Sequence, residues 1–331
     1  MGLKIIKPGL LSTIQDAGRT AYLDQAVAIS GAMDQFSFSL ANLLVGNDEN
    51  EAVIEFTFGG IEILAQSDLL IAFVGAQEFI TINEMSVPSH RPVFVPAQST
   101  LKISHQNQGK FSYLAIAGGL DIPLVLESRS TFLTANFGGF KGRALQKGDE
   151  LTTQESLSET SKNLLKKLKG TQVNFTNWSI PTHQFSAQTQ FIRIIKGPEL
   201  EWFDNLAIAD FVSEPYQITD GNRMGVHLSG KLVQRKKSHL QELLSTAVVP
   251  GTIQVSGNGA LILLMADCQT TGGYPRIGKV IEVDLPKCAQ LKTGDQLQFE
   301  FISLKEAEKL YLERSKDLQK LKASVQFKSM E

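Results

Sequence analysis

The sequence has only two cysteines among its 331 residues, and it has no long apolar run. Cys268 and Cys288 provide neither a disulfide framework nor a metal-binding spacing. The five histidines have no partner three or four residues away, which disfavours a zinc site. No apolar run approaches the roughly 18 residues needed to span a bilayer, and the N-terminus has no signal-peptide core. We therefore expect no metal, no membrane segment and a cytoplasmic location.

Basic clusters are also scarce. The formal net charge is −2 at pH 7, and the longest basic run is 235–237. Because phosphate neutralisation needs clustered Lys and Arg, nucleic-acid binding is disfavoured. The sequence contains no Walker loop, no Gly-x-Ser-x-Gly elbow and no Met-Lys-Met biotin attachment site. The chain is thus predicted to bind neither nucleic acid nor a covalent biotin of its own.

Short strand-like segments, separated by Gly, Asn, Pro and Ser, make up most of the chain. Strands and helices do not alternate regularly, which disfavours a doubly wound parallel sheet. Capping residues and the spacing of apolar side chains predict four helices. They are a helix capped by Asp34 and closed by Gly46, one over about 158–169, one over about 238–244, and a last one starting at Ser303.

A faint internal repeat suggests two β-domains. The string 5–10 is echoed by 194–199, and the string 145–151 is echoed by 291–297. Each pair would open and close one domain, in keeping with the chain length. We predict domains at 1–155 (with an insertion) and 191–303, a helix and linker at 156–190, and a C-terminal helix at 304–331. The apolar stripe of that helix either packs on its own domain or binds a partner.

The most informative stretch is 267–276, which follows the very apolar run 260–266. A strand buried on both faces has such a run. The chain then presents an acid, an amide, hydroxyls, a phenol and a guanidinium, with Gly272 and Gly273 allowing close backbone approach to a ligand. Polar groups at the mouth of a buried strand form small-molecule sites. The alternative is a tight turn with ordinary polar residues.

Two further loops carry groups suited to a ligand. In 220–225, glycines flank Asn222 and Arg223, and a guanidinium matches a carboxylate or phosphate. The alternative is that Arg223 pairs with an acid. In 249–255, a turn leads into a strand with one amide, Gln254, that can point inward or lie on the surface.

A second candidate site lies near the N-terminus. Asp16 and Arg19 flank Gly18 and can face one side of a turn, or they can simply pair with each other. Asp34 stands where a helix N-terminus offers backbone N–H groups to an anion. The alternative is that Asp34 itself caps the helix.

With these motifs in view, the chain resembles the C subunit of bacterial ATP-dependent 5-oxoprolinase, a family also described as allophanate hydrolase subunit 2 or a biotin-dependent carboxyltransferase domain. The resemblance covers about residues 3–302. Two departures are Cys268, where Arg, His or Ala is more usual, and Thr246, where an acid is usual. The matching strings are 8–19, 30–34, 41–47, Glu55 with 59–60, 117–119, 128–131, 196–198, 222–225, 250–254 and 269–275.

The resemblance implies a mainly β fold of two tandem cyclophilin-like β-barrel domains, with a few short helices and a C-terminal helix. It implies an enzyme subunit that works with a B subunit, similar to allophanate hydrolase subunit 1, and a third 5-oxoprolinase subunit. Together they would cleave the 5-oxoproline lactam to glutamate with ATP bound through the complex. One alternative is a carboxyltransferase domain of the urea amidolyase type, using biotin carried on another protein. Another is a non-catalytic partner of a B subunit that antagonises a kinase inhibitor.

Residue chemistry suggests the roles within that site. We predict that Arg223 and Arg276 bind the substrate carboxylate or a phosphoryl group, and that Asp267 positions water or assists proton transfer. The predicted substrate-binding residues are Asn222, Met224, Gln254, Gln269, Thr270, Thr271 and Tyr274. The second candidate site comprises Asp16, Arg19 and Asp34.

Overall fold

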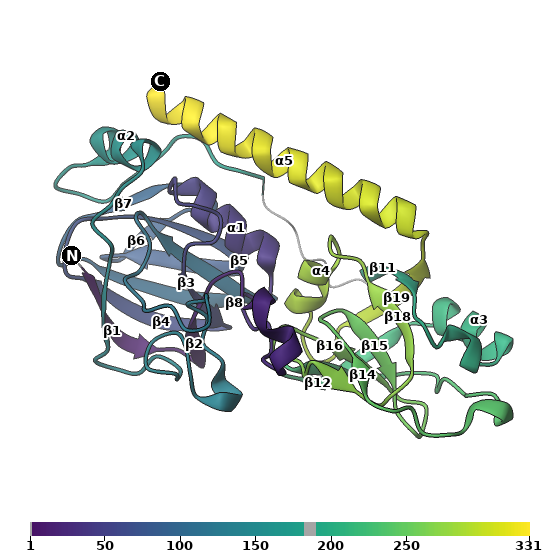
Figure 1. The fold of residues 1–331 in the computed structure, drawn as a ribbon. Helices are drawn as coiled ribbons and strands as arrows, with labels where there is room; N and C mark the ends of the chain where they lie inside the picture. The colour runs from purple at the N-terminus through teal and green to yellow at the C-terminus, as the bar shows by residue number, and fades with distance from the viewer. Residues whose placement is uncertain (1, 182–189) are drawn as a thin grey trace. The chain divides into compact units, whose positions relative to one another are not determined.

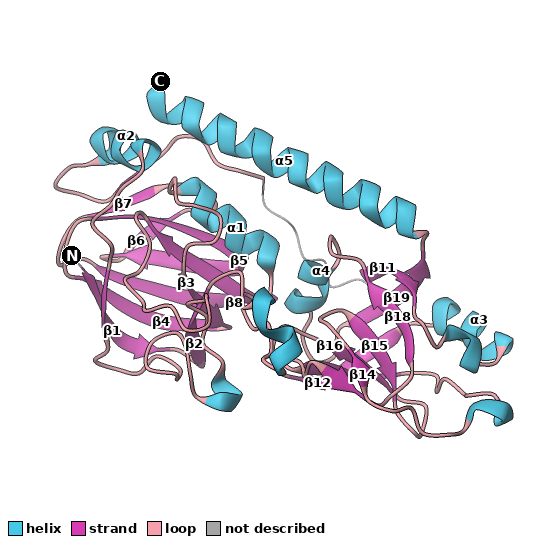
Figure 2. Cartoon of the chain, viewed as in Figure 1, coloured by secondary structure: helices cyan, strands magenta, loops and turns pink. Residues whose placement is uncertain are grey.

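The computed structural model describes residues 2–181 and 190–331, and the chain forms two compact units (Figure 1). Among the described residues, unit 1 comprises 2–18, 30–181 and 316–331, and unit 2 comprises 19–29 and 190–315. Strands prevail over helices in both units (Figure 2), which confirms the mainly β prediction.

Unit 1 is built on one ten-stranded sheet. Its longest strands, β5 and β8, pair antiparallel, with Phe73 opposite Leu114 and Ile80 opposite Ile103. Side chains alternate across a strand, so one face of the sheet supplies the buried apolar core. The strands are β1 Gly2–Pro8, β2 Leu11–Gln15, β3 Val53–Thr57, β4 Gly59–Ala65, β5 Leu69–Ile82, β6 Met85–Val87, β7 Val93–Val95, β8 Thr100–Ile116, β9 Glu150–Thr152 and β10 Asn174–Phe175.

Two helices predicted in unit 1 are confirmed, and for the first of them the predicted cap at Asp34 is confirmed as well. Helix α1 spans Gln35–Leu44, and the Asp34 carboxylate accepts a 2.9 Å hydrogen bond from the Ser37 N–H. Helix α2 spans Glu159–Leu168, and the Ser158 hydroxyl accepts a 3.1 Å bond from the Ser161 N–H. Both side chains satisfy backbone donors that a helix start otherwise leaves open.

Unit 2 is a closed barrel of seven strands, as the barrel prediction requires. Strands β11 and β19 pair in parallel, and the other neighbours pair antiparallel. Around the barrel the strands are β11 Gln190–Lys196, β18 Arg276–Val280, β15 Thr252–Val255, β16 Leu261–Leu264, β13 Gly225–Ser229, β12 Tyr216–Gly221 and β19 Gln296–Phe301. A two-stranded ladder of β14 Thr246–Ala247 and β17 Thr271–Gly272 completes the unit's strands within the described ranges.

The repeat predicted from the sequence corresponds to the same turn in both units. Gly148 and Gly294 have φ values of 90° and 95°, a region that favours glycine. The carboxylates of Asp149 and Asp295 each accept a hydrogen bond from the backbone N–H three residues earlier, at 2.7 and 2.8 Å. The echoed strings therefore form matching turns before β9 and β19.

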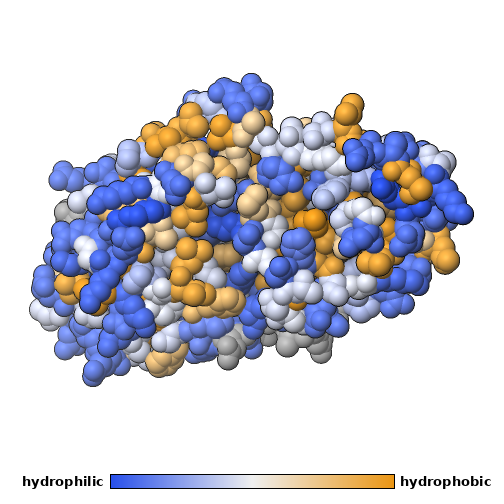
Figure 3. Space-filling model, turned by 90° about the horizontal axis from the view of Figure 1, so that it is seen from below, coloured by the Kyte–Doolittle hydropathy of each residue, from blue (hydrophilic) through white to orange (hydrophobic). Residues whose placement is uncertain are grey.

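The helix predicted over about 238–244 is wrong. The structure has only a 3-10 turn, η4 Lys237–His239, and the chain then runs to β14. Leu240 and Leu244 are 59% and 87% exposed, so a helical stripe here would have no core to cover, and a short helix without packing is unstable. Apolar patches among hydrophilic side chains are visible in the space-filling view (Figure 3). We call residues 236–245 the strap.

Two short helices were not predicted, α3 Asn205–Ser213 and α4 Leu285–Gln290. Phe211 of α3 stacks on Phe299 of the barrel at 4.9 Å between ring centroids. The last helix, α5 Leu304–Met330, confirms the prediction from Ser303, whose hydroxyl accepts a 3.1 Å bond from the Glu306 N–H. Among the helices in the described ranges, none combines the length and apolarity needed to cross a membrane.

Candidate functional site

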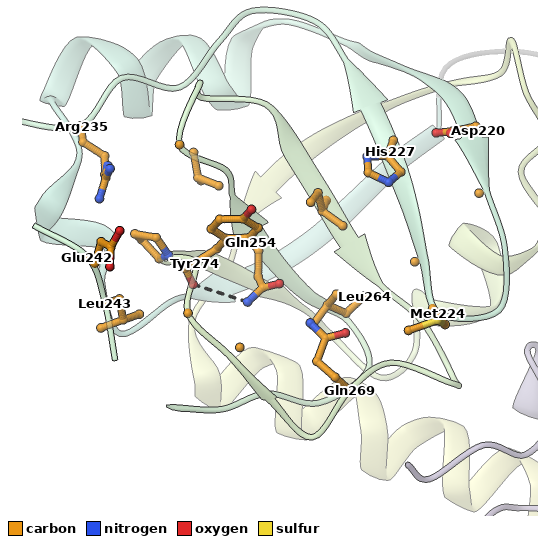
Figure 4. A pocket seen from close by; sticks show the side chains of 18 of the residues that line it. Asp220, Met224, His227, Arg235, Glu242, Leu243, Gln254, Leu264, Gln269 and Tyr274 are labelled. Carbon is orange, nitrogen blue, oxygen red and sulfur yellow. Dashed lines mark hydrogen bonds between the residues drawn. The ribbon is translucent and has the colours of Figure 1, made fainter. Parts of the chain in front are cut away.

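The barrel of unit 2 contains a cavity of about 930 Å³ (Figure 4). Three carboxamides line it, those of Asn222, Gln254 and Gln269. The remaining lining residues come from the barrel strands, the strap and the hairpin that contains β17. They are Asp220, Gly221, Met224, Gly225, His227, Arg235, Leu240, Glu242, Leu243, Val255, Gly257, Ile262, Leu264, Gly272, Gly273, Tyr274 and Pro275.

Gln254 is the buried polar group of the cavity. It lies on β15, all of whose residues are buried, and it is only 2% exposed. Its Nε2 donates a long 3.5 Å hydrogen bond to the Tyr274 carbonyl, and its Oε1 accepts none from the residues that the structure describes. This oxygen is not fully buried, so it is open to the cavity that Gln254 lines. The Gln254 carboxamide is therefore set up to bind a donor that enters the cavity.

Glycines bring the hairpin close to this amide. A Cβ atom on Gly272 would lie 2.5 Å from Gln254 Nε2, and one on Gly273 would lie 3.0 Å from the Leu243 carbonyl. The two-residue ladder of β14 with β17 holds the hairpin in this place. The sequence predicted that these two glycines allow the backbone to approach a ligand closely. In the structure they allow it to approach the Gln254 side chain and the strap.

The other two carboxamides are open to a ligand. Asn222 Oδ1 accepts hydrogen bonds from the N–H groups of Met224 at 2.7 Å and Gly225 at 3.3 Å, forming a tight side-chain-to-backbone turn. Its Nδ2 has no acceptor among the described residues, and the Gln269 amide makes no hydrogen bond with any of them. Met224 and Tyr274 are 38% and 47% exposed. Of the predicted substrate-binding residues, these two and the three carboxamides line the cavity.

Arg223 and Asp267 form an ion pair outside the cavity lining. Arg223 donates from Nε and Nη2 to the Asp267 carboxylate at 2.9 and 3.0 Å. Their side chains are 6% and 3% exposed. The Asp267 N–H also donates to the Arg223 carbonyl at 2.8 Å. Of the two alternatives that the sequence left open for Arg223, the structure thus shows pairing with an acid. The ion pair joins the turn before β13 to the start of the hairpin.

Arg276 is held in the same manner. Its Nε and Nη2 donate to the Glu199 carboxylate at 2.8 and 2.6 Å, and its Nη1 donates to the Ala247 carbonyl at 2.8 Å. The hydrogen bonds to Glu199 raise the pKa of the Arg276 guanidinium. Thr270 and Thr271 also lie outside the lining, and Thr271 pairs with Ala247 in the β14–β17 ladder.

The departure at position 268 has a structural explanation. Cys268 is 3% exposed and packs in a small apolar cluster with Val248 and Leu264. Burial raises the pKa of its thiol to about 12, so the thiolate, which is the reactive form, is scarce at neutral pH. Cys268 therefore acts as a small apolar side chain.

The residues of the second candidate site are occupied by internal bonds. The Asp16 carboxylate accepts hydrogen bonds from Gly18 N–H at 2.8 Å, Ser128 Oγ at 2.7 Å and Ser130 Oγ at 2.5 Å. The Asp34 carboxylate caps α1. Arg19 is only 1% exposed. The capping alternative for Asp34 is thus the observed one.

Sequence reasoning missed the charged groups of the cavity. Arg235 was overlooked because 235–237 stood out only as a short basic run, and Glu242 because it lay in the helix predicted over 238–244. His227 lies on a strand without a motif. In the ranges that the structure describes, no three His, Cys, Asp or Glu side chains gather closely enough to hold a metal ion.

Comparison with known proteins identifies the family of this chain. The model of the family "Carboxyltransferase domain, subdomain A and B" matches residues 25–301, so the chain belongs to this carboxyltransferase domain family, as its motifs indicated. The chain is similar to the 5-oxoprolinase C subunit of Escherichia coli (strain K12), with 36% identity over 306 residues that cover 92% of this chain and 93% of that protein. It is also 34% identical to the 5-oxoprolinase C subunit of Haemophilus influenzae, covering 90% of this chain and 91% of that protein.

Larger proteins contain a related domain. The chain is 33% identical to urea amidolyase of Saccharomyces cerevisiae over 90% of its own length but only 16% of that protein. The crystal structure of the K. lactis urea amidolyase superposes with a TM-score of 0.87 at 28% identity, covering 97% of this chain and 20% of that one. The similarity to the urea amidolyases is therefore confined to one part of them.

Proposed function

We propose that this chain is the C subunit of an ATP-dependent 5-oxoprolinase and that its cavity binds the lactam. The observation that carries the proposal is the set of three carboxamides around the cavity, with the buried Gln254 among them. A carboxamide presents one acceptor and two donors, which match the adjacent N–H and C=O of a lactam. The similarity to two proteins named as C subunits of 5-oxoprolinase supports the same activity.

The chemistry requires activation of the lactam. Its nitrogen leaves poorly, so water alone attacks slowly. Transfer of the ATP γ-phosphoryl group to the lactam oxygen would create a better electrophile. Water would then add at that carbon, and opening of the ring C–N bond would give the acyl phosphate of glutamate. A second water would hydrolyse this acyl phosphate to glutamate and phosphate. In this scheme the cavity orients the amide and donates hydrogen bonds to its oxygen.

The lining does not suit a triphosphate. It contains one arginine against the two carboxylates of Asp220 and Glu242, and no glycine-rich phosphate loop. We therefore assign ATP to the assembled complex, which would also contain a B subunit and a third subunit, in the cytoplasm. In this proposal Arg223, Asp267 and Arg276 position the hairpin, because their charges are already paired.

The test uses the assembled enzyme. The chain is co-expressed with the products of its neighbouring genes, and ATP hydrolysis is measured with and without 5-oxoproline. We expect 5-oxoproline to stimulate hydrolysis, and Gln254→Leu to abolish that stimulation. Gln234→Leu, at an exposed position outside the cavity lining, is the matched control. Absence of 5-oxoproline-dependent hydrolysis by the complete wild-type assembly would contradict the proposal.

A carboxyltransferase of the urea amidolyase type is the second candidate, favoured by the family match and by the similarity to urea amidolyase. It predicts turnover that needs a biotinylated carrier protein and that avidin blocks. The 5-oxoprolinase proposal predicts hydrolysis that avidin leaves unchanged. A purely regulatory partner would bind a B subunit tightly and give no turnover in any mixture.

A further inference from the structure

The arginines of unit 2 differ in whether an acid already neutralises them. Arg193 donates to the Asp284 carboxylate at 2.8 and 2.7 Å, and Arg223 and Arg276 are held by equally short pairs. Arg235 makes no ion pair with any residue that the structure describes, and it is the one arginine that lines the cavity. Its charge is therefore available to a ligand.

The fold holds Arg235 in a defined position. Its backbone bridges to Phe203, which is 0% exposed, and it follows the buried Val233 by two residues. Its Nη1 donates a 3.2 Å hydrogen bond to the Gln241 carbonyl of the strap. Nε and Nη2 have no acceptor within the described part of the chain. One edge of the guanidinium is thus fixed while the other stays open, and an open edge binds a carboxylate with two parallel hydrogen bonds.

The cavity connects this charge to the buried amide. In Figure 4, Arg235, Glu242 and Leu243 lie at one end, Asp220 and His227 lie at the other, and Gln254 lies between them. A ligand whose amide group binds Gln254 can thus extend a charged group toward Arg235. Asp220 opposes an anion at the far end of the lining, so the end with Arg235 is where a negative group is best accommodated, and the Glu242 carboxylate at that end weakens the attraction.

We propose that Arg235 binds the carboxylate of the substrate and thereby makes the cavity selective for an anionic amide over a neutral one. The inference rests on the proposed function. An oxyanion here could also be the phosphoryl group of ATP, and kinetics can separate the two sources. Binding of the carboxylate affects the KM for the lactam acid, whereas binding of a phosphoryl group affects the KM for ATP.

The experiment compares Arg235→Gln with Lys237→Gln in the complete assembly. Lys237 is exposed, lies on the strap outside the cavity lining, and gives the same change in net charge. Loss of a charged hydrogen-bonding partner should raise the KM for 5-oxoproline roughly 10- to 100-fold in Arg235→Gln. The KM for ATP should stay constant in both variants. Inhibition by 2-pyrrolidinone, which has the lactam ring but no carboxylate, should also be unchanged.

A second variant, Glu242→Gln, removes a nearby negative charge. It should lower the KM for 5-oxoproline and leave inhibition by 2-pyrrolidinone unchanged. A KM for 5-oxoproline that is equal in Arg235→Gln and Lys237→Gln overturns the inference and leaves the proposed function standing. A change confined to the KM for ATP, or an equal loss for 2-pyrrolidinone, also overturns it. Binding without turnover in the wild type refutes the proposed function alone, because calorimetry of the variants still tests Arg235. If the wild type shows neither binding nor turnover, both the proposed function and the role of Arg235 are refuted.

Discussion

A buried carboxyl group in unit 1 leads to a specific pH dependence of stability. Glu78 lies on β5 with its side chain 3% exposed, and Ser112 Oγ donates a 3.0 Å hydrogen bond to its Oε1. Its Oε2 is buried and has no partner in the described part of the chain. Burial raises the pKa of Glu78 from 4.5 to about 7, and the hydrogen bond from Ser112 offsets only part of this rise. His105 Nδ1 is the titratable group facing it, at 3.5 Å.

The sign follows from which state holds the proton more tightly. The folded state binds the Glu78 proton better than the unfolded state, so the free energy of unfolding falls as the pH rises from 4.5 to about 7. Below this window the contribution is fully present, and above it the loss is complete. A rise of this size corresponds to roughly 3 kcal/mol lost from unit 1 across the window, most of it between pH 5 and pH 8.

The assay can isolate unit 1 because the chain has two tryptophans. Trp178 lies in unit 1 and Trp202 in unit 2, so in a Trp202→Phe background the tryptophan emission reports unit 1. Urea unfolding is measured between pH 5 and pH 8 for this background and for Glu78→Gln in it. The glutamine does not ionise, so the variant should be more stable by about 2–3 kcal/mol at pH 8 and nearly equal at pH 5.

Glu62→Gln on β4 is the matched control, since Glu62 is only partly buried, and it should keep the wild-type slope. Equal stability of unit 1 at pH 5 and pH 8, or stability that increases as the pH rises, would refute the role assigned to Glu78. The same conclusion would follow if Glu78→Gln showed the pH dependence of the wild type.

Three further predictions concern folding and the cavity. Asp267→Asn leaves the buried Arg223 charge without its acid, so unit 2 should lose about 3–5 kcal/mol in urea unfolding; an unchanged midpoint would refute the structural role of the pair. Gly272→Ala puts a methyl group against the cavity's buried glutamine and should weaken 5-oxoproline binding about tenfold in calorimetry, whereas Gly170→Ala, which lies outside the cavity lining and whose Cβ meets nothing within 4 Å, should not. Ser158→Ala removes the cap of α2 and should cost about 1 kcal/mol in thermal unfolding, and a neutral effect would argue against that cap.

Local signals in the sequence predicted part of the structure well. The caps at Asp34 and Ser303 act on the backbone within three residues, so their patterns were visible in the sequence. The apolar run 260–266 likewise predicted β16, which is almost wholly buried. The family strings then indicated the barrel, which no single segment could have revealed.

The pairing of charges was not predictable from local patterns. Arg223 and Asp267 are 44 residues apart, and Arg276 and Glu199 are 77 apart, so only the strand arrangement brings them together. The sequence suggested anion binding for Arg223 because glycines flank it, and for Arg276 because it ends the polar stretch 267–276. The helix prediction over 238–244 failed for a related reason. The leucines of this segment have helical spacing, but the barrel gives them no surface on which a helix could be buried. Leu240 and Leu243 line the cavity together with Glu242, and Arg235 lines it from just before the strap.

The most direct measurement is a crystal structure of the assembled complex with 5-oxoproline and a non-hydrolysable ATP analogue. We predict that the lactam ring occupies the unit 2 cavity, with its amide hydrogen-bonded to the Gln254 carboxamide. Density for the lactam in a partner subunit, with this cavity holding only water, would contradict the account.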